Sequence, residues 1–202
     1  MANNKKFLAL GCLAIVIVGL LIVGVYATSV YNSLVGLDQK VQAQWGQVEN
    51  VYQRRADLIP NLVETVKGAA AFEQNTFTAV TEARAKVGQV QVNAGQLTPD
   101  AFAKFQQAQD GLSSALSRLL VVVEKYPELK ATENFKELQA QLESTENRIT
   151  IERMRFNEAA QGFNTRRNRF PAVIIANFFG KFAEKPYFKS QPGAETAPKV
   201  KF

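Results

Sequence analysis

Residues 7–26, FLALGCLAIVIVGLLIVGVY, form an apolar stretch without a single charged side chain. At a rise of about 1.5 Å per residue, a helix of this length spans about 30 Å, the thickness of the hydrocarbon core of a bilayer. A helix also satisfies its backbone polar groups internally, as a lipid environment requires. The sequence therefore predicts a transmembrane helix over residues 7–27.

The charges that flank this stretch indicate its orientation. Lys5 and Lys6 precede it, whereas the next charged residues on the other side are Asp38 and Lys40. Because basic residues next to a span are retained in the cytoplasm, we expect residues 1–6 to form a short cytoplasmic N-terminus. The rest of this single-pass chain would then lie outside the cytoplasm.

Two processing signals compete weakly with this interpretation. The tripeptide ending at Ala27 has the small residues of a signal-peptidase site, and LALGC, ending at Cys12, faintly resembles a lipoprotein cleavage site. Signal peptides have shorter apolar cores, of about 7 to 15 residues, and here the apolar run continues well past Cys12. A transmembrane helix is therefore favoured.

Beyond the apolar stretch, apolar residues recur at spacings of three and four, which is typical of amphipathic helices. The first stripe comprises Val30, Leu34, Leu37, Val41, Trp45, Val48 and Tyr52. Proline and cap signals divide the chain into predicted helices at about 28–56, 60–91, 99–126 and 132–169. The second would follow a turn near Asp57 and have Pro60 at its first position, and the third would have Thr98 as its N-cap.

Each predicted helix has one apolar face, and short connections favour antiparallel neighbours. The expected fold is therefore all-α: a single N-terminal transmembrane helix followed by an antiparallel long-helix (four-helix) bundle over residues 28–170. Four helices return the chain to the end at which it started. Residues 171–189 should consequently lie near the membrane.

This last segment mixes apolar, aromatic and basic residues, so we expect it to contact membrane lipid. The candidate membrane-contact residues are Val173, Ile174, Phe178, Phe179, Lys181, Phe182, Lys185, Tyr187 and Phe188. Two alternatives stay open, because the same residues would also suit a plug at the end of the bundle or a contact between subunits. The Pro- and Gly-containing tail, residues 190–202, is predicted to be disordered.

Composition argues against most enzyme chemistry. The chain has no histidine and one cysteine, so the usual zinc sites and His-dependent nucleophile systems cannot be assembled. We expect no enzymatic activity, and no catalytic residue, cofactor or metal site is predicted. The net charge is +6, and residues 148–202 hold eleven Lys or Arg against four Glu. Outside the cytoplasm such a basic region suits anionic lipid, and no nucleic-acid partner is expected.

Polar residues gather in two further places. One group, around the first predicted turn, comprises Arg54, Arg55, Asp57, Asn61 and Glu64, and the other, along the fourth helix, comprises Glu146, Asn147, Arg148, Asn157 and Asn164. Arg55 and Glu64 are expected to form ordinary exposed pairs, and Asp57 and Asn61 to cap the second helix. Asn147, Arg148 and Asn157 are instead favoured as members of a buried network or a docking surface.

Several of these stretches resemble the LemA family of bacterial membrane proteins. The resemblance is carried by Tyr31-Asn32, Val35, Val41, Trp45 and Val48, and by YQRRADLIPNLV (52–63), EKYPELKA (124–131), TENRI (145–149), RMRFNEAAQGFN (153–164), FPAVIIANFFG (170–180) and PYF (186–188). It implies one N-terminal membrane helix, a helical bundle outside the cytoplasm and no established catalytic activity. The expected location is thus the bacterial inner (cytoplasmic) membrane, with the bulk of the chain in the periplasm.

Two functions are compatible with these features. The first is a membrane-anchored helical scaffold that assembles into a homo-oligomer and organises or shapes the envelope membrane. The second is an adaptor whose bundle binds another envelope protein. A hydrolase based on paired carboxylates is less favoured, because it would need a concave pocket that a filled bundle rarely offers.

Overall fold

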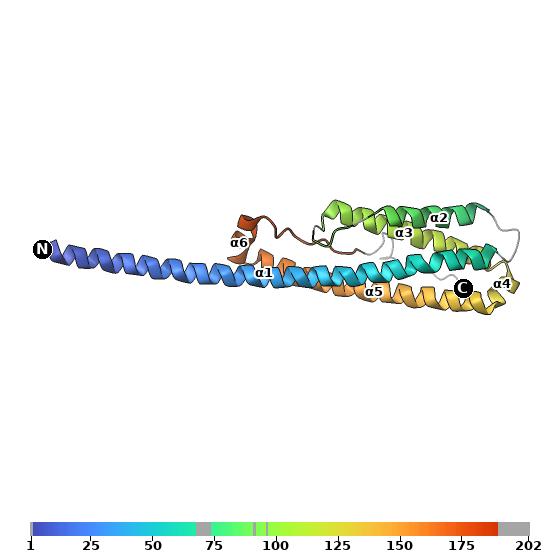
Figure 1. The fold of residues 1–202 in the computed structure, drawn as a ribbon, viewed down its shortest axis with the longest axis horizontal. Coiled ribbons are helices and arrows are strands. Elements are labelled where there is room, and N and C mark those ends of the chain that lie inside the picture. The colour runs from blue at the N-terminus through green and yellow to red at the C-terminus, as the bar shows by residue number, and fades with distance from the viewer. Residues whose placement is uncertain (1, 68–73, 91, 96, 190–202) are drawn as a thin grey trace, which may run out of the picture. The chain divides into compact units, whose positions relative to one another are not determined.

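The computed structural model describes residues 2–67, 74–90, 92–95 and 97–189, with side chains from Leu10 onward. Within these residues all regular structure is α-helical (Figure 1). The helices are α1 (Ala2–Lys67), α2 (Gln74–Gln89), α3 (Pro99–Val123), α4 (Pro127–Ala131), α5 (Glu133–Asn168) and α6 (Ala172–Phe179). The predicted all-α class is confirmed, and the tail expected to be disordered, 190–202, lies outside the described residues.

The chain divides into two compact units. Unit 1 is formed by segments 1–41 and 161–184, and unit 2 by segments 42–160 and 185–202. Helices α1 and α5 each contribute residues to both units. Unit 1 contains the N-terminal apolar stretch and α6, whereas unit 2 contains α2, α3 and α4.

In unit 1, the exposure of α1 changes abruptly along its length. The side chains from Leu10 to Tyr26 are exposed, and this part of α1 is long and apolar enough to cross a membrane. Val30 is the first fully buried residue, and Leu34 and Val41 continue the buried stripe. Packing of α1 against other parts of unit 1 therefore begins directly after the apolar stretch.

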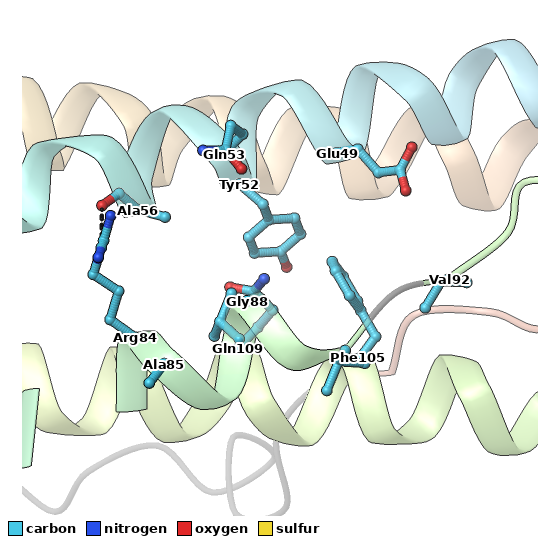
Figure 2. A pocket seen from close by; sticks show the side chains of 12 residues that line it. Glu49, Tyr52, Gln53, Ala56, Arg84, Ala85, Gly88, Val92, Phe105 and Gln109 are labelled. Atoms are coloured by element: carbon cyan, nitrogen blue, oxygen red, sulfur yellow. Dashed lines mark hydrogen bonds between the residues drawn. The ribbon is translucent and has the colours of Figure 1, made fainter. Parts of the chain in front are cut away.

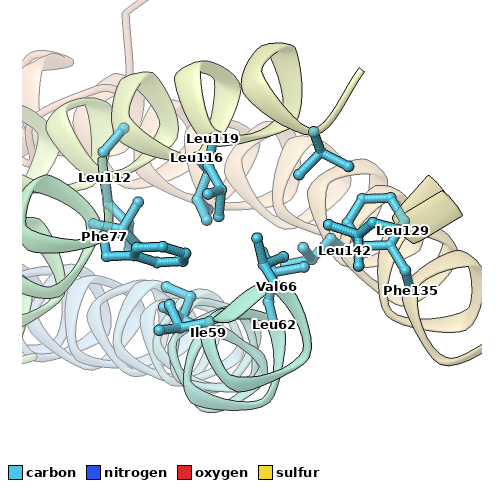
Figure 3. Packing of buried hydrophobic residues seen from close by; sticks show 14 residues of the cluster. Ile59, Leu62, Val66, Phe77, Leu112, Leu116, Leu119, Leu129, Phe135 and Leu142 are labelled. Atoms are coloured by element: carbon cyan, nitrogen blue, oxygen red, sulfur yellow. The ribbon is translucent and has the colours of Figure 1, made fainter. Parts of the chain in front are cut away.

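Unit 2 has a core to which α1, α2, α3, α4 and α5 all contribute. Its buried members are Ile59, Leu62, Val63, Val66, Phe77, Val80, Leu112, Ala115, Leu116, Leu119, Val123, Leu129, Phe135 and Leu142. Figure 3 shows Ile59, Leu62 and Val66 of α1 directed toward the leucines of α3. The three-and-four spacing predicted these helix faces correctly, because a helix can bury only one stripe of its surface.

Contacts between the helices of unit 2 give their relative directions. Trp45 of α1 packs on Phe102 of α3, and Arg55, further along α1, reaches Ser113, further along α3. These helices therefore run in the same direction. On α5 the order is reversed, since Gln44 bonds Glu152 whereas Arg55 bonds Glu146. The alternation is that of an antiparallel bundle.

The break predicted at Pro60 is wrong. Helix α1 continues through Pro60 to Lys67, and the next described helix, α2, begins only at Gln74. Proline lacks the N–H that would bond the carbonyl four residues earlier, which is normally costly inside a helix. Here that carbonyl, on Ala56, accepts a hydrogen bond of 3.1 Å from Nε of Arg84 on α2. A long-range donor thus replaces the missing backbone bond.

The other predicted boundaries lie closer to the structure. Thr98 is the N-cap of α3, where its hydroxyl oxygen accepts from the backbone N–H of Ala101 at 3.3 Å, and Pro99 is the first helical residue. The predicted fourth helix corresponds to α5, preceded by the separate short helix α4. Asp57 does not cap a helix, because it lies inside α1, where its carboxylate accepts from Gln53 at 2.7 Å.

Candidate membrane-contact site

Helix α6 buries its small residues and exposes its large apolar ones. Ala172 and Ala176 are 0% and 1% exposed, whereas Ile174 and Phe178 are 59% and 83% exposed. The pairs lie at i and i+4, so alanines form one face of the helix and bulky side chains the opposite face. A helix whose outer surface faced only water would have the reverse distribution. The exposed face of α6 is therefore suited to a nonpolar environment.

Aromatic contacts hold α6 and its following loop against α1. The ring of Tyr31 meets Phe179 edge-on at a centroid distance of 4.8 Å and Phe182 at 5.5 Å. Lys181 donates from Nζ to the Tyr31 hydroxyl at 2.8 Å, and its ammonium lies 4.7 Å from the centre of the same ring. Between α6 and this lysine, Gly180 ends the helix with a φ of 65°, a left-handed conformation that favours glycine.

Residues at the end of α5 bind the same loop. Arg167 donates from Nε to the carbonyl oxygen of Phe182 and from a terminal nitrogen to Oδ1 of Asn177 at 3.1 Å. Asn168 next to it donates to the carboxylate of Glu184 at 2.5 Å. These polar contacts fix α6 relative to α1 and α5 within unit 1.

The position of Tyr31 sets the level of α6 along α1. With a span over residues 7–27, Tyr31 lies four residues beyond its end, which corresponds to about 6 Å of helix. The polar headgroup layer on each side of the hydrocarbon core is about 5 to 7 Å thick. Phe179, which packs on Tyr31, is thus level with the headgroups of such a bilayer.

The predicted membrane-contact residues differ in their exposure. In unit 1, Ile174, Phe178, Phe179 and Lys181 are exposed and Val173 is half-buried, but Phe182 is only 1% exposed. The other three belong to unit 2, where Lys185 and Phe188 are buried and Tyr187 is exposed. For Phe182, Lys185 and Phe188 the expectation of lipid contact is corrected, because their side chains are buried inside the protein.

Phe188 fills an aromatic slot in unit 2. Its ring stacks on Trp45 at 6.2 Å with an interplanar angle of 12°, and it contacts Phe102 at 4.6 Å and Phe156 at 5.4 Å. The guanidinium of Arg153 covers the ring at 4.7 Å. These distances are those of favourable aromatic and cation–π pairs, so the segment around Phe188 is a packed part of the bundle.

Side chains of α3 and α5 bind the backbone of this segment. Asn157 donates from Nδ2 to the carbonyl oxygen of Phe188 at 3.0 Å and accepts from its N–H at 2.9 Å. The next carbonyl, on Lys189, accepts from Gln106 at 3.0 Å and from Arg153 at 2.9 Å. The predicted network role of Asn157 thus takes the form of a clamp on the backbone of the C-terminal segment.

Arg55 was predicted to form an exposed pair, and this is wrong. Its side chain is buried and donates to Glu146 at 2.9 Å, to Ser113 at 2.8 Å and to the side-chain oxygen of Gln109 at 2.6 Å. The signal was present in the sequence, because Arg55 continues the α1 stripe three residues after Tyr52. Its guanidinium also lies 5.0 Å from the centre of that tyrosine ring.

Three other members of the two polar groups have exposed side chains. Glu64 forms the expected exposed pair with Lys67 at 3.1 Å. Asn147 and Arg148, favoured as network members, have exposed side chains on α5. The buried network therefore centres on Arg55 and not on these two residues.

Two grooves on unit 2 border this network. One, of about 570 Å³, opens between α1, α2 and α3, and Figure 2 shows Tyr52 pointing into it beside Gln109. The other, of about 380 Å³, is lined by Arg55, Ser113, Glu146 and several leucines. Tyr52 lines both grooves, and burial raises the pKa of its phenol above 10.0 despite the opposing charges of Arg153 and Arg55. Among the described residues no cluster of metal-ligating side chains is found.

Comparison with known proteins adds a family and three relatives. Residues 44–202 match the model of the LemA family. The magnetosome protein MamQ of Magnetospirillum gryphiswaldense is 29% identical over 183 residues, which cover 82% of this chain and 67% of that protein. Two proteins of Paramagnetospirillum magneticum, magnetosome proteins MamQ 1 and MamQ 2, are each 28% identical over 187 residues, with the same coverage.

Proposed function

This chain belongs to the LemA family, and from that premise we propose that it is a non-enzymatic, membrane-anchored helical scaffold that organises or shapes the membrane holding it. The observation that carries this proposal is the inverted face of α6, with Phe178 exposed and Ala176 buried. It provides a second contact with the membrane beside the apolar part of α1. A protein held at two neighbouring points resists tilting and acts on the lipid between them.

The proposed setting is the inner membrane of a bacterium, with residues 1–6 in the cytoplasm and the helical bundle in the periplasm. Lys5 and Lys6 before the apolar stretch favour this orientation. The MamQ relatives are named as magnetosome proteins.

Self-assembly is the second part of the proposal. Ile151 and Met154 of α5 are 43% and 55% exposed, lie one turn apart and therefore share a face of the helix. Such a face is suited to packing against the same face of a second copy. Light scattering on the detergent-solubilised chain should show a mass above one copy per particle, which falls when Ile151 and Met154 are changed to Glu. A single-copy mass at all protein concentrations would refute assembly.

The membrane-shaping role is tested by reconstitution. The full chain is placed in vesicles at increasing protein-to-lipid ratio, and vesicle shape is imaged by electron cryomicroscopy. We expect shape changes with the natural chain and smaller ones with Ile174→Ser/Phe178→Ser, which alters exposed positions only. The matched control is Val121→Ser, at a residue of α3 that is 60% exposed. Unchanged vesicles at every ratio would contradict the role.

The alternative function is an adaptor that binds another envelope protein. The groove of about 380 Å³ favours it, since Leu116, Leu120 and Leu142 line it beside the charged groups of Arg55 and Glu146. This mixture suits a helix or peptide with one apolar and one charged face. Crosslinking in native membranes from a cysteine at Ser117, which also lines the groove, should yield one recurring foreign product if the adaptor role holds, and self-products or none if it does not.

A further inference from the structure

We propose that α6 recognises lipid-packing defects, that is, places in a bilayer surface where acyl chains are exposed between headgroups, and does not depend on anionic headgroups. This inference rests on the proposed membrane contact of α6 and specifies its lipid chemistry. It differs from the expectation that lysines of this segment bind lipid phosphates.

The contacting face is apolar and bulky. Helix α6 contains no charged residue, and Ile174, Phe178 and Phe179 are 59%, 83% and 49% exposed. Phe170, just before the helix, is 82% exposed. Large apolar side chains are stabilised when they leave water for a nonpolar space. In the headgroup layer, such space exists where lipids pack poorly.

The cations around α6 are already engaged within the protein. Lys181 donates to the Tyr31 hydroxyl, Arg166 donates to Ser33 at 3.4 Å, and Arg167 bonds the Phe182 carbonyl. Of the basic residues in segment 161–184, this leaves Arg169, which is exposed. Recognition of anionic lipid by charge usually takes about four to eight clustered Lys or Arg residues. Electrostatic attraction is therefore a minor contribution here.

The attachment of α6 also limits how deeply it can insert. Its contacts with Tyr31 and Arg167 hold it about 6 Å beyond the end of a span over residues 7–27, within the headgroup layer. A helix held at this depth cannot itself enter the hydrocarbon core. Burial of its apolar side chains therefore depends on whether acyl chains are exposed between the headgroups.

The test uses the full chain carrying Phe178→Trp, reconstituted into vesicles of defined composition. The natural Trp45 is 0% exposed, so the unsubstituted chain supplies a constant background to subtract. Insertion is measured as the blue shift of the new indole and its protection from the neutral aqueous quencher acrylamide. Vesicles are small or large, made of unsaturated or saturated phosphatidylcholine, with or without phosphatidylglycerol, in about 0.1 M or about 1 M salt.

We expect several-fold greater protection in small, unsaturated vesicles than in large, saturated ones. Phosphatidylglycerol and salt should leave it unchanged. Adding Ile174→Ser should reduce the protection, whereas an indole placed by Val121→Trp on α3 should stay accessible to the quencher in every vesicle.

Two results would overturn the inference in different ways. Protection that requires phosphatidylglycerol and disappears in high salt would replace packing defects with charge as the recognised feature, while membrane contact by α6 would stand. Full accessibility of the indole in all vesicles would remove the membrane contact itself, and with it this part of the proposed function.

Discussion

Nε of Arg84 on α2 lies 3.1 Å from the carbonyl oxygen of Ala56 on α1, and this hydrogen bond occupies the acceptor that Pro60 leaves without a backbone donor. A side chain of α2 thus supplies the hydrogen bond that the backbone of α1 lacks at Pro60. The same contact ties α2 to α1 beside the larger groove (Figure 2).

Loss of this contact should have a measurable and conditional cost. Arg84→Ala is expected to lower the free energy of unfolding by about 1 kcal/mol, because the Ala56 carbonyl loses a charged donor. In a Pro60→Ala background the backbone N–H returns, so the cost of Arg84→Ala should shrink. Urea unfolding of the four proteins, followed by circular dichroism, gives the coupling. Equal costs in both backgrounds would mean that Arg84 does not serve this carbonyl.

Because the guanidinium of Arg55 is buried, its partner Glu146 should contribute more to stability than a carboxylate paired with an exposed cation. Glu146→Gln is expected to destabilise unit 2 by about 1 to 2 kcal/mol, since a charge-assisted bond to a buried cation is lost. The matched control is Glu64→Gln, whose pair with Lys67 is exposed on both sides and should leave stability unchanged within error. Similar effects of the two substitutions in thermal unfolding would contradict the buried role of Arg55.

Asn157 should hold the C-terminal segment through its donor as well as its acceptor. Asn157→Asp keeps an acceptor for the Phe188 N–H but places a carboxylate against the Phe188 carbonyl, so we expect a loss of about 1 to 3 kcal/mol. Hydrogen exchange at the Phe188 amide should accelerate more than exchange in α3. Asn147→Asp, on the exposed face of the same helix, is the control and should change neither. Unaltered exchange at Phe188 in Asn157→Asp would refute the clamp.

Tyr52 predicts how stability changes at alkaline pH. Burial raises the pKa of its phenol above 10.0, so above that pH the unfolded chain releases this proton while the folded chain retains it. The contribution of Tyr52 to stability is therefore complete below pH 10 and is lost as the pH rises through the folded-state pKa. Tyr52→Phe should lose less stability between neutral and strongly alkaline pH than the natural chain. Parallel pH profiles of denaturant midpoints would contradict this.

The sequence predicted the helices better than their ends. The apolar spacing located the buried stripes, because burial of one helix face is a local property of the pattern. The break at Pro60 was predicted from the same local rules and failed, since its remedy, Arg84, is 24 residues away and meets Ala56 only in the folded bundle. The prediction for Arg55 failed for a related reason. Its charge favours an exposed position, but Arg55 lies on the apolar stripe of α1 and is therefore buried.

The candidate site was predictable in composition and not in detail. The aromatic and basic segment after α5 indicated a special surface, yet alternating Phe and Lys do not tell which rings face outward. Phe178 and Phe182 differ by one helical turn in the sequence, but Gly180 redirects the chain between them, and only the first is exposed. The exposure of Ile174 and Phe178 depends on the burial of the opposite face, with Ala172 and Ala176, which is decided only in the folded protein.

Because Phe188 inserts between aromatic rings, the packing of unit 2 depends on the C-terminal segment that contains it. In a chain truncated after Glu184, Trp45, Phe102 and Phe156 would surround an empty cavity instead of the Phe188 ring. Exposed aromatic rings of this kind promote aggregation, and an aromatic peptide in solution could bind in the cavity. The truncated chain would thus have a tendency to aggregate that the full chain lacks.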